Sequence, residues 1–220
     1  MSTGRLDWRS RIMNIEEIHN NRGLAHAANG DYDRAIADFD TAIQIKPNFA
    51  AAYENRGTTY LQKGDYDHAV DDLSKAIELN PVDIRLYINR AVAFDKRGER
   101  DRAIADCSKA IEINPKFDVA YFKRGIYHFD KGDFDRAIAD LDMSISLNPD
   151  FAFAYSNRGI VYAAQDDIDR AIADYDKAIE LAPDFSEAYV NRGNAYAKKG
   201  DNDRAIADYN RAIALSQKQA

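Results

Sequence analysis

The feature that most constrains this 220-residue chain is a small side chain that returns every 34 residues. One set of these positions holds glycine or alanine six times, at Gly23, Gly57, Ala91, Gly125, Gly159 and Gly193. An alanine stands twelve residues after each of them, at Ala35, Ala69, Ala103, Ala137, Ala171 and Ala205. All five prolines follow the same grid, at Pro47, Pro81, Pro115, Pro149 and Pro183. A period of this length indicates stacked supersecondary units rather than one globular core.

Each period has the pattern of two helices joined by a tight turn. Tyr155, Gly159 and Tyr162 follow the i, i+4, i+7 spacing that places side chains on one face of a helix. Gly132 marks the expected end of a first helix, because glycine adopts left-handed backbone most readily. Asp133 then suits the N-cap of the second helix. The proline stops that second helix, since the residue before a proline disfavours helical backbone.

This grid resembles the tetratricopeptide repeat, a helix–turn–helix unit of 34 residues. The resemblance implies an all-α fold, a right-handed superhelical α-solenoid of six such units. The units are expected at 16–49, 50–83, 84–117, 118–151, 152–185 and 186–219, after an N-terminal extension of residues 1–15 that contains Trp8. The chain departs from the family pattern where Ala91 replaces the usual small glycine and Asp166 replaces the turn glycine. No proline closes the sixth unit.

Composition limits the classes of partner. The formal net charge of −7 opposes binding to nucleic acid or to an anionic membrane surface, both of which need a basic patch. No apolar run approaches the roughly 20 residues of a membrane span, and no signal peptide is predicted. The single cysteine, Cys107, excludes an intramolecular disulfide and is expected to pack as a small core residue. We therefore expect a cytoplasmic protein with no membrane insertion.

A polar row recurs inside the triplet Asn-Arg-Gly. Its members are Asn21, Asn55, Asn89, Lys123, Asn157 and Asn191. Asn157 lies two residues from both Tyr155 and Gly159, so it points away from the core-facing side of its helix. The family resemblance implies that this position faces a concave groove. There the row resembles the asparagine ladder that holds an extended peptide in the repeat domain of O-GlcNAc transferase.

The chemistry of asparagine suits that role, because its amide both donates to and accepts from a peptide unit. Two alternatives stay open, a plain surface position and a hydrogen bond to a neighbouring helix of the array. Lys123 interrupts the row and is expected to meet an acidic group.

Other groove-facing positions are apolar in units three to five. They are Ile88, Val92, Phe122, Ile126, Phe129, Phe153 and Ile160. Exposed apolar patches often mark binding sites, so these residues are expected to form side-chain pockets for a peptide. Phe122 and Phe153 are the strongest candidates. The alternative is that these side chains lean sideways into the next repeat.

The arginine of the triplet is present in all six units, as Arg22, Arg56, Arg90, Arg124, Arg158 and Arg192. An aspartate follows each of them by sixteen residues, at Asp38, Asp72, Asp106, Asp140, Asp174 and Asp208. We expect each guanidinium to form a bidentate pair with a carboxylate on a second helix, of its own unit or of a neighbour. Such pairs would fix the register of stacking.

No pattern in the chain predicts catalysis, a metal or a cofactor. His26 and His128 occupy the slot that holds Tyr60 and Tyr162 elsewhere, which favours a packing role. His-x-x-His, Cys-x-x-Cys and glycine-rich phosphate-loop patterns are absent from the sequence. The carboxylates follow the repeat period, whereas a catalytic pair should break it.

The sequence therefore predicts a non-catalytic scaffold or adaptor that binds an extended peptide or a partner protein in its groove. One alternative is self-assembly, in which the C-terminal repeat meets another copy through Ile206, Tyr209 and Ile213. A second alternative is an accessory or regulatory domain for a separate enzyme.

Overall fold

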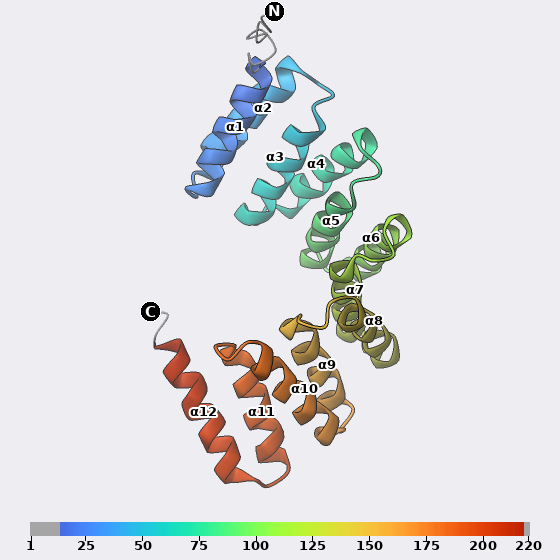
Figure 1. The fold of residues 1–220 in the computed structure, drawn as a ribbon. Coiled ribbons are helices and arrows are strands. Elements are labelled where there is room, and N and C mark those ends of the chain that lie inside the picture. The colour runs from blue at the N-terminus through green and yellow to red at the C-terminus, as the bar shows by residue number, and fades with distance from the viewer. Residues whose placement is uncertain (1–13, 218–220) are drawn as a thin grey trace, which may run out of the picture. The chain divides into compact units, whose positions relative to one another are not determined.

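The computed structural model describes residues 14–217, and within that range it contains twelve α-helices and no strand (Figure 1). The helices are α1 (Ile15–Ala28), α2 (Tyr32–Ile45), α3 (Ala50–Lys63), α4 (Tyr66–Leu79), α5 (Ile84–Lys96), α6 (Arg100–Ile113), α7 (Asp118–Asp130), α8 (Phe134–Leu147), α9 (Ala152–Ala164), α10 (Ile168–Leu181), α11 (Ser186–Lys198) and α12 (Asn202–Ser216). The predicted all-α array of helix–turn–helix units is confirmed. Trp8 and the rest of 1–13 lie outside the described residues.

The chain divides into two compact units, residues 1–102 and 103–220. In the first unit α1 packs on α2 and α3 packs on α4, while α2 and α4 also contact the helix that follows each of them. In the second unit α7 packs on α8, α9 on α10 and α11 on α12, again with contacts from α8 to α9 and from α10 to α11. First helices also touch one another, since α9 contacts both α7 and α11.

The turns inside the helix pairs follow the sequence prediction closely. Gly132 has φ +80°, the left-handed conformation expected there, and the Asp133 side chain accepts a hydrogen bond from the Arg136 backbone N–H at 3.3 Å. Asp31 differs, because its carboxylate pairs with Arg34 at 3.0 Å and makes no cap hydrogen bond. Asp166 takes the turn position without glycine, at φ 66°. Aspartate tolerates this conformation better than most residues.

Small residues let the two helices of each pair approach closely. At Gly159 an added Cβ would lie 2.7 Å from Cε1 of Tyr175, a contact too short for packed atoms. Ala171 and Ala178 are fully buried on the facing helix. The grid of small residues is therefore a packing requirement, as the sequence indicated.

Contacts between successive pairs are largely apolar in both units. In the second unit Phe122 and Leu141 pack with Ala154 of the next first helix, and Phe151 lies against the same cluster. The rings of Phe122 and Phe151 are 4.8 Å apart between centroids. In the first unit Leu86 packs in the same way against the preceding pair. A continuous core results within each unit, as expected for stacked repeats.

Ser144 is an imperfection in this core. It occupies a position that holds alanine in the other five repeats, and it is fully buried. Its Oγ has no hydrogen-bond partner among residues 14–217. We expect Ser144→Ala to stabilise the fold by about 1 kcal/mol, because it removes an unsatisfied buried hydroxyl. Urea denaturation would measure the change, and the reverse substitution Ala178→Ser should lower stability. Equal stability of wild type and Ser144→Ala would contradict this account.

Candidate functional site

The arginines of the triplet form the expected bidentate pairs. In five repeats Nε and Nη2 each donate to one oxygen of the aspartate sixteen residues later, at 2.5–2.8 Å. These pairs are Arg22–Asp38, Arg56–Asp72, Arg124–Asp140, Arg158–Asp174 and Arg192–Asp208. Each pair joins the first helix of a repeat to the second helix of the same repeat. The predicted pairing is confirmed in these five repeats.

The same guanidinium groups also reach back by one repeat. Nη1 of Arg158 donates to Asp142 at 2.5 Å, and Nη1 of Arg192 donates to Asp176 at 2.6 Å. Arg124 makes the equivalent contact with the Ser108 hydroxyl at 3.0 Å. One side chain therefore holds its own helix pair together and fixes its register on the preceding pair. Both expected kinds of partner, within the repeat and in a neighbouring repeat, are used.

These pairs shift the pKa values of the groups that form them. The hydrogen bond from Arg22 lowers the pKa of Asp38 to about 2, against the usual 3.8. Because the folded-state pKa lies below the unfolded one, this pair stabilises the fold fully above pH ~4 and is lost as the pH falls toward 2. The pKa values of Arg56, Arg158 and Arg192 are raised, with hydrogen bonds to their aspartates opposing the effect of burial.

Two asparagines of the polar row make hydrogen bonds within the protein. The Asn55 side-chain amide donates to Asn20 Oδ1 at 2.8 Å, which links α3 to α1. The Asn157 amide donates to the Phe153 carbonyl one turn earlier in α9, at 2.8 Å. Asn21 is exposed, whereas Asn89 and Asn191 are half-buried. The alternative of a bond to a neighbouring helix therefore applies to Asn55. Lys123 is half-buried on α7.

The apolar stripe divides into buried and exposed members. Ile88 and Phe122 are only 8 % and 9 % exposed, so the expectation of an open pocket residue does not hold for them. Phe122 is covered by Phe151, the residue just before α9. Ile126 and Phe129 are half-buried against the same cluster, and Val92 and Ile160 are half-buried too. Phe153 alone among the stripe is exposed, at 51 %.

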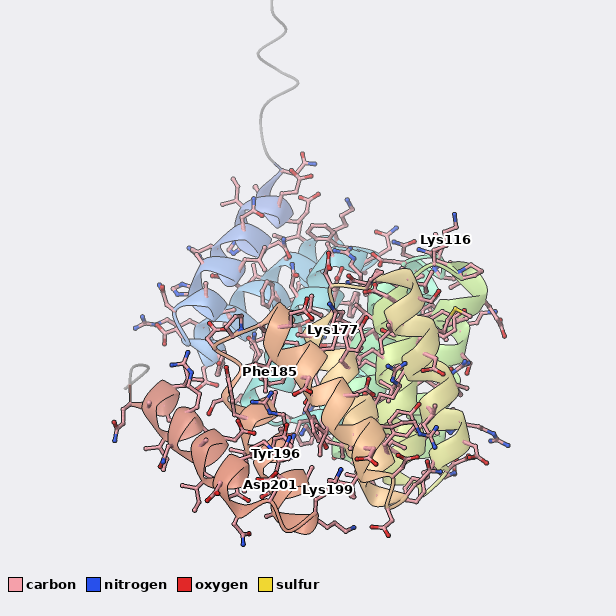
Figure 2. The ribbon with its side chains drawn as sticks, turned by 60° about the horizontal axis from the view of Figure 1, so that its bottom comes forward. Lys116, Lys177, Phe185, Tyr196, Lys199 and Asp201 are labelled. Atoms are coloured by element: carbon pink, nitrogen blue, oxygen red, sulfur yellow. The ribbon has the colours of Figure 1, made fainter. Side chains whose placement is uncertain are left out.

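Phe153 forms one side of a hollow at the start of α11. Its ring lies 4.6 Å from that of Phe185 between centroids, and Ala182, Asp184 and Glu187 complete much of the lining. The hollow has a volume of about 380 Å³. Figure 2 labels Phe185 at this end of α11 and Lys199 at its other end.

A second hollow of about 230 Å³ opens toward the other end of the same helices. Ile160 from α9, Tyr175 from α10 and Asn191 from α11 line it, together with Asn194 and Lys198. Asn194 Oδ1 also accepts a hydrogen bond from the Tyr209 hydroxyl at 2.8 Å. We call the surface made by Phe153, Asn157, Ile160, Phe185 and Asn191, with its two hollows, the α9–α11 face.

Sequence reasoning missed Phe185 and Asn194. Phe185 precedes α11 and belongs to a position that is aromatic in four repeats, as Phe49, Phe117, Phe151 and Phe185, so the period carried a signal for it. Asn194 is equivalent to Ile126 and Ile160 in the preceding repeats, and only its polar side chain sets it apart from them.

Cys107 and His128 are both buried within this fold. Cys107 has no exposed surface, and burial raises the pKa of its thiol to about 12, so it stays protonated. His128 is buried in its aromatic slot, which confirms its packing role. In the part of the chain that the structure describes, no three His, Cys, Asp or Glu side chains gather in an arrangement that would hold a metal ion.

The buried His128 carries a prediction about acid stability. Burial lowers its pKa below the usual 6.5, despite Asp140 4.0 Å away. Since the unfolded chain then binds the proton more readily, the free energy of unfolding should fall as the pH drops below about 6.5. His128→Tyr should remove this part of the decline, because Tyr162 fills the same slot in the next repeat. Thermal melts of both proteins at pH ~7.5 and ~5.5 would show it. Identical pH dependence would contradict the prediction.

Every helix between residues 14 and 217 falls short of the length and apolar character that a membrane crossing requires.

Comparison with protein families identifies the repeat. Family models described as tetratricopeptide repeat match residues 50–83 and 84–117, and another matches 122–184 and 156–220. A model described as TPR repeat matches 23–64. Together they cover 23–117 and 122–220. The chain belongs to the tetratricopeptide repeat family. Members of this family generally act as non-catalytic scaffolds for protein interactions. Comparison with curated proteins gave no match.

Solved TPR structures share the fold. MamA is 29 % identical with a TM-score of 0.66, over 74 % of this chain and 95 % of MamA. YrrB, described as a TPR protein with an unusual peptide-binding site, is 24 % identical with a TM-score of 0.65, over 87 % of this chain and 95 % of its own. PilW, a type IV pilus biogenesis factor, is 17 % identical with a TM-score of 0.80, over 89 % and 91 % of the two chains. The YrrB and PilW likenesses concern the TPR fold alone.

Proposed function

We propose that this TPR protein is a non-catalytic scaffold that binds an extended peptide segment of a partner protein on the α9–α11 face. The observation that carries the proposal is the exposed Phe153 beside Phe185, at the edge of one of two hollows on the same helices. Contiguous apolar patches at a protein surface often mark binding sites, and here the exposed Phe153 adjoins the half-buried Phe185. The family's general role as interaction scaffold supports the same reading.

The spacing of the two hollows suits a peptide backbone. Phe153, Asn157 and Ile160 follow i, i+4, i+7 on α9, so they lie along one side of the helix. Seven residues of helix span about 10 Å, which is the length of about three extended residues. In the polyproline II form of an extended peptide, residues three apart lie on the same side and about 9 Å apart. A peptide in this form with apolar side chains three residues apart therefore reaches both hollows. Asn157 lies between them on α9. Its amide donates to the Phe153 carbonyl, which leaves its side-chain oxygen to accept from a peptide N–H.

The charges around Phe153 indicate which kind of peptide would bind. Asp184 and Glu187 line its hollow, and the whole chain carries a net charge of −7. A basic side chain next to the apolar one would meet both carboxylates and the aromatic faces. We therefore propose that the peptide carries an arginine or lysine beside its first apolar anchor. In the same unit as this face, residues 103–220, the proposal includes a ladder role for Asn191, a ligand contact by Lys123 and flanking contacts of Ile126 and Phe129. In the other unit, a ladder role for Asn21 and Asn89 and a contact by Val92 are a separate proposal for a peptide bound there.

A random linear peptide library, displayed on phage and selected on the immobilised protein, tests this function. Selected peptides should share apolar residues about three positions apart and an adjacent basic residue. Phe153→Ala should weaken a selected peptide about tenfold or more, as expected for an aromatic anchor. Asn157→Ala and Asn191→Ala should each weaken it about two- to tenfold, the value of one net hydrogen bond.

Met143→Ala is the matched control, because Met143 is an apolar residue on α8 with similar exposure, 44 %, and lies outside the α9–α11 face. It should leave peptide affinity unchanged. Selected peptides that bind Phe153→Ala as tightly as wild type would exclude the α9–α11 face as the site. A selection without any binding peptide would count against peptide capture altogether.

Self-association through the C-terminal repeat is a second candidate function. Ile206 and Ile213 on α12 are each 57 % exposed, whereas the equivalent Ile172 and Ile179 on α10 are half-buried. Solution mass measured across protein concentration tests it directly. A cytoplasmic location is also part of our proposal, supported by the single, buried thiol of Cys107.

A further inference from the structure

The first and last helix pairs expose apolar residues at positions that are buried or half-buried in most internal repeats. On α1 these are Ile15 and Ile18, at 64 % and 48 % exposure. On the last pair they are Ile206 and Ile213 of α12, together with Val190 of α11 at 39 %. Because equivalent positions are 34 residues apart, the internal junctions show what normally covers each of them.

The junction between α7–α8 and α9 gives the pattern. Phe151 and Ala154, at the start of α9, pack against Phe122 of α7 and against Leu141 and Ile145 of α8. Ala154 and Leu141 are fully buried there. The start of a first helix thus inserts between the two helices of the preceding pair.

Helix α1 carries the inserting half of this junction. Ile15 and Ile18 precede Phe151 and Ala154 by four repeat periods each. At the position of Ile18, every later repeat has a fully or almost fully buried residue, namely Ala52, Leu86, Ala120, Ala154 and Ala188. Only at α1, among the described repeats, is this position open.

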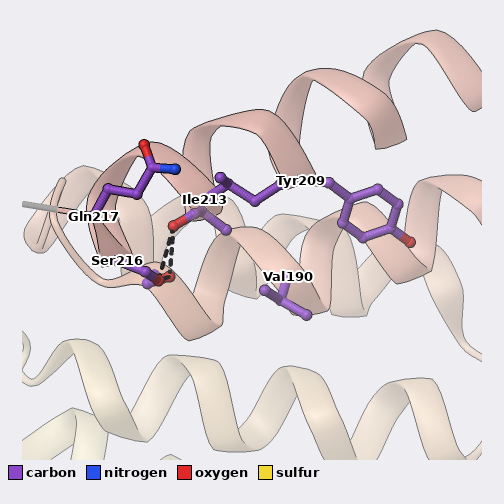
Figure 3. Close-up of a pocket in the computed structure, with 7 residues that line it drawn as sticks. Val190, Tyr209, Ile213, Ser216 and Gln217 are labelled. Atoms are coloured by element: carbon purple, nitrogen blue, oxygen red, sulfur yellow. Dashed lines mark hydrogen bonds between the residues drawn. The ribbon is translucent and has the colours of Figure 1, made fainter. Parts of the chain in front are cut away.

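Helices α11 and α12 carry the receiving half. Val190, Tyr209 and Ile213 follow Phe122, Leu141 and Ile145 by two repeat periods each. They line a hollow of about 540 Å³, which Figure 3 shows together with Ser216 and Gln217 at its edge. The hollow is bounded almost wholly by apolar surface and lies where the next first helix would insert.

The polar contacts of the junction have counterparts at both ends. In internal repeats the arginine also binds the preceding pair, as Arg192 does to Asp176. On α12 the position of Asp176 is Asn210, whose side-chain carbonyl can accept the same hydrogen bond. The Arg22 side chain is 60 % exposed, against 20 % for Arg192, since α1 has no such second partner among the described residues.

We propose that α1 of a second copy packs on α11 and α12 of the first, in the register of the internal junctions. This inference rests on the proposed self-association and names its two faces. Ile15 and Ile18 enter the hollow between Val190 and Ile213, and Arg22 reaches Asn210. The volumes compensate, since Ile18 is larger than Ala154 while Val190 is smaller than Phe122. The two faces differ, so the contact is heterologous, and each copy keeps one open face of each kind.

Two single-face variants of the full chain test the proposal. Ile18→Glu places a charge in the inserting face, and Ile213→Glu places one in the receiving face. Both residues are exposed, so the monomer of each variant should still fold. We expect the wild-type mass, measured by light scattering from roughly 1 to 500 µM, to rise above the 24.8 kDa of one chain. Each variant alone should remain monomeric, with self-association weakened about 100-fold or more by a glutamate in an apolar contact.

Mixing the two variants is the decisive step. The Ile18→Glu copy keeps an intact receiving face and the Ile213→Glu copy keeps an intact inserting face. The mixture should therefore form a 1:1 dimer and nothing larger. Ala28→Glu on α1 and Ala207→Glu on α12 are matched controls, because both positions stay exposed in the described chain. They should associate like wild type.

The outcomes separate this inference from the proposals on which it rests. A wild-type protein that stays monomeric up to the highest concentration overturns both self-association and the register. Association that survives Ile18→Glu, or variants that fail to complement each other, overturns the register alone. Peptide capture on the α9–α11 face is independent of all these results.

Discussion

Replacing Asp174 with alanine is expected to cost about 2–4 kcal/mol of folding free energy, because it leaves a half-buried guanidinium without its bidentate partner. Both Arg158 bonds to Asp174 are short, at 2.8 and 2.6 Å, and the Asp174 side chain is only 8 % exposed. Arg158 keeps its bond to Asp142 and retains some contact with water, which places the loss below that of a fully buried charge. The shift of the urea midpoint, at unchanged slope, measures it.

The second carboxylate on the same arginine provides the control. Asp142 is 50 % exposed, so Asp142→Ala should cost less than about 1 kcal/mol, the usual range for a surface ion pair. The two variants remove the same chemical group from the same guanidinium and differ mainly in burial. Equal losses from both would show that the arginine pairs inside a repeat do not stabilise it more than the exposed pairs do.

These arginine pairs were predictable because the sequence repeats both partners at a fixed separation. Arg158 and Asp174 recur together in every unit, and a strict period leaves few geometries for two charges on packed helices. The cap at Asp133 and the turn at Gly132 were predictable for a related reason, since each depends on a few neighbouring residues. Local chemistry and strict periodicity together fixed most of the fold.

The site was harder to predict than the fold. The position of a residue around its own helix does not show which residues of neighbouring segments pack over it. From helical periodicity, Phe122 and Phe153 were both predicted to face the groove. Phe151, the residue just before α9, covers Phe122, whereas Phe153 stays exposed beside the rings of Phe151 and Phe185. Asn55 shows the same limit, since its partner Asn20 stands at a position that varies from repeat to repeat. Periodicity carries no information about such positions.

Tyr175→Ala should lower the free energy of unfolding even more than Asp174→Ala, by about 3–5 kcal/mol, as expected for a large side chain truncated in a packed core. Tyr175 is 2 % exposed, and its ring fills the space that Gly159 leaves between α9 and α10. Tyr175 and Asn191 line the same hollow. Removing the Tyr175 ring should therefore enlarge that hollow and weaken peptide binding. Denaturation in urea and the affinity of a selected peptide measure the two effects.

Tyr175→Leu separates cavity formation from the loss of an aromatic ring. Leu73 and Leu141 fill the same position in other repeats and are fully buried there. The variant should therefore cost no more than about 1.5 kcal/mol, as for a tolerated change of shape within a core. A loss as large as that of Tyr175→Ala would mean that the ring makes a specific contact beyond filling space.

The facing glycine completes the argument through a double-mutant cycle. A Cβ on residue 159 would lie 2.7 Å from the Tyr175 ring, whereas at Gly125 the nearest atom is Cγ of Leu141, at 3.1 Å. Gly159→Ala should therefore be more harmful in wild type than in the Tyr175→Leu background, by about 1 kcal/mol or more, because residues in contact are not additive. With leucine opposite, the better helix propensity of alanine should offset part of the remaining cost. Strict additivity would contradict the view that the size of the facing side chain is what requires glycine at this position.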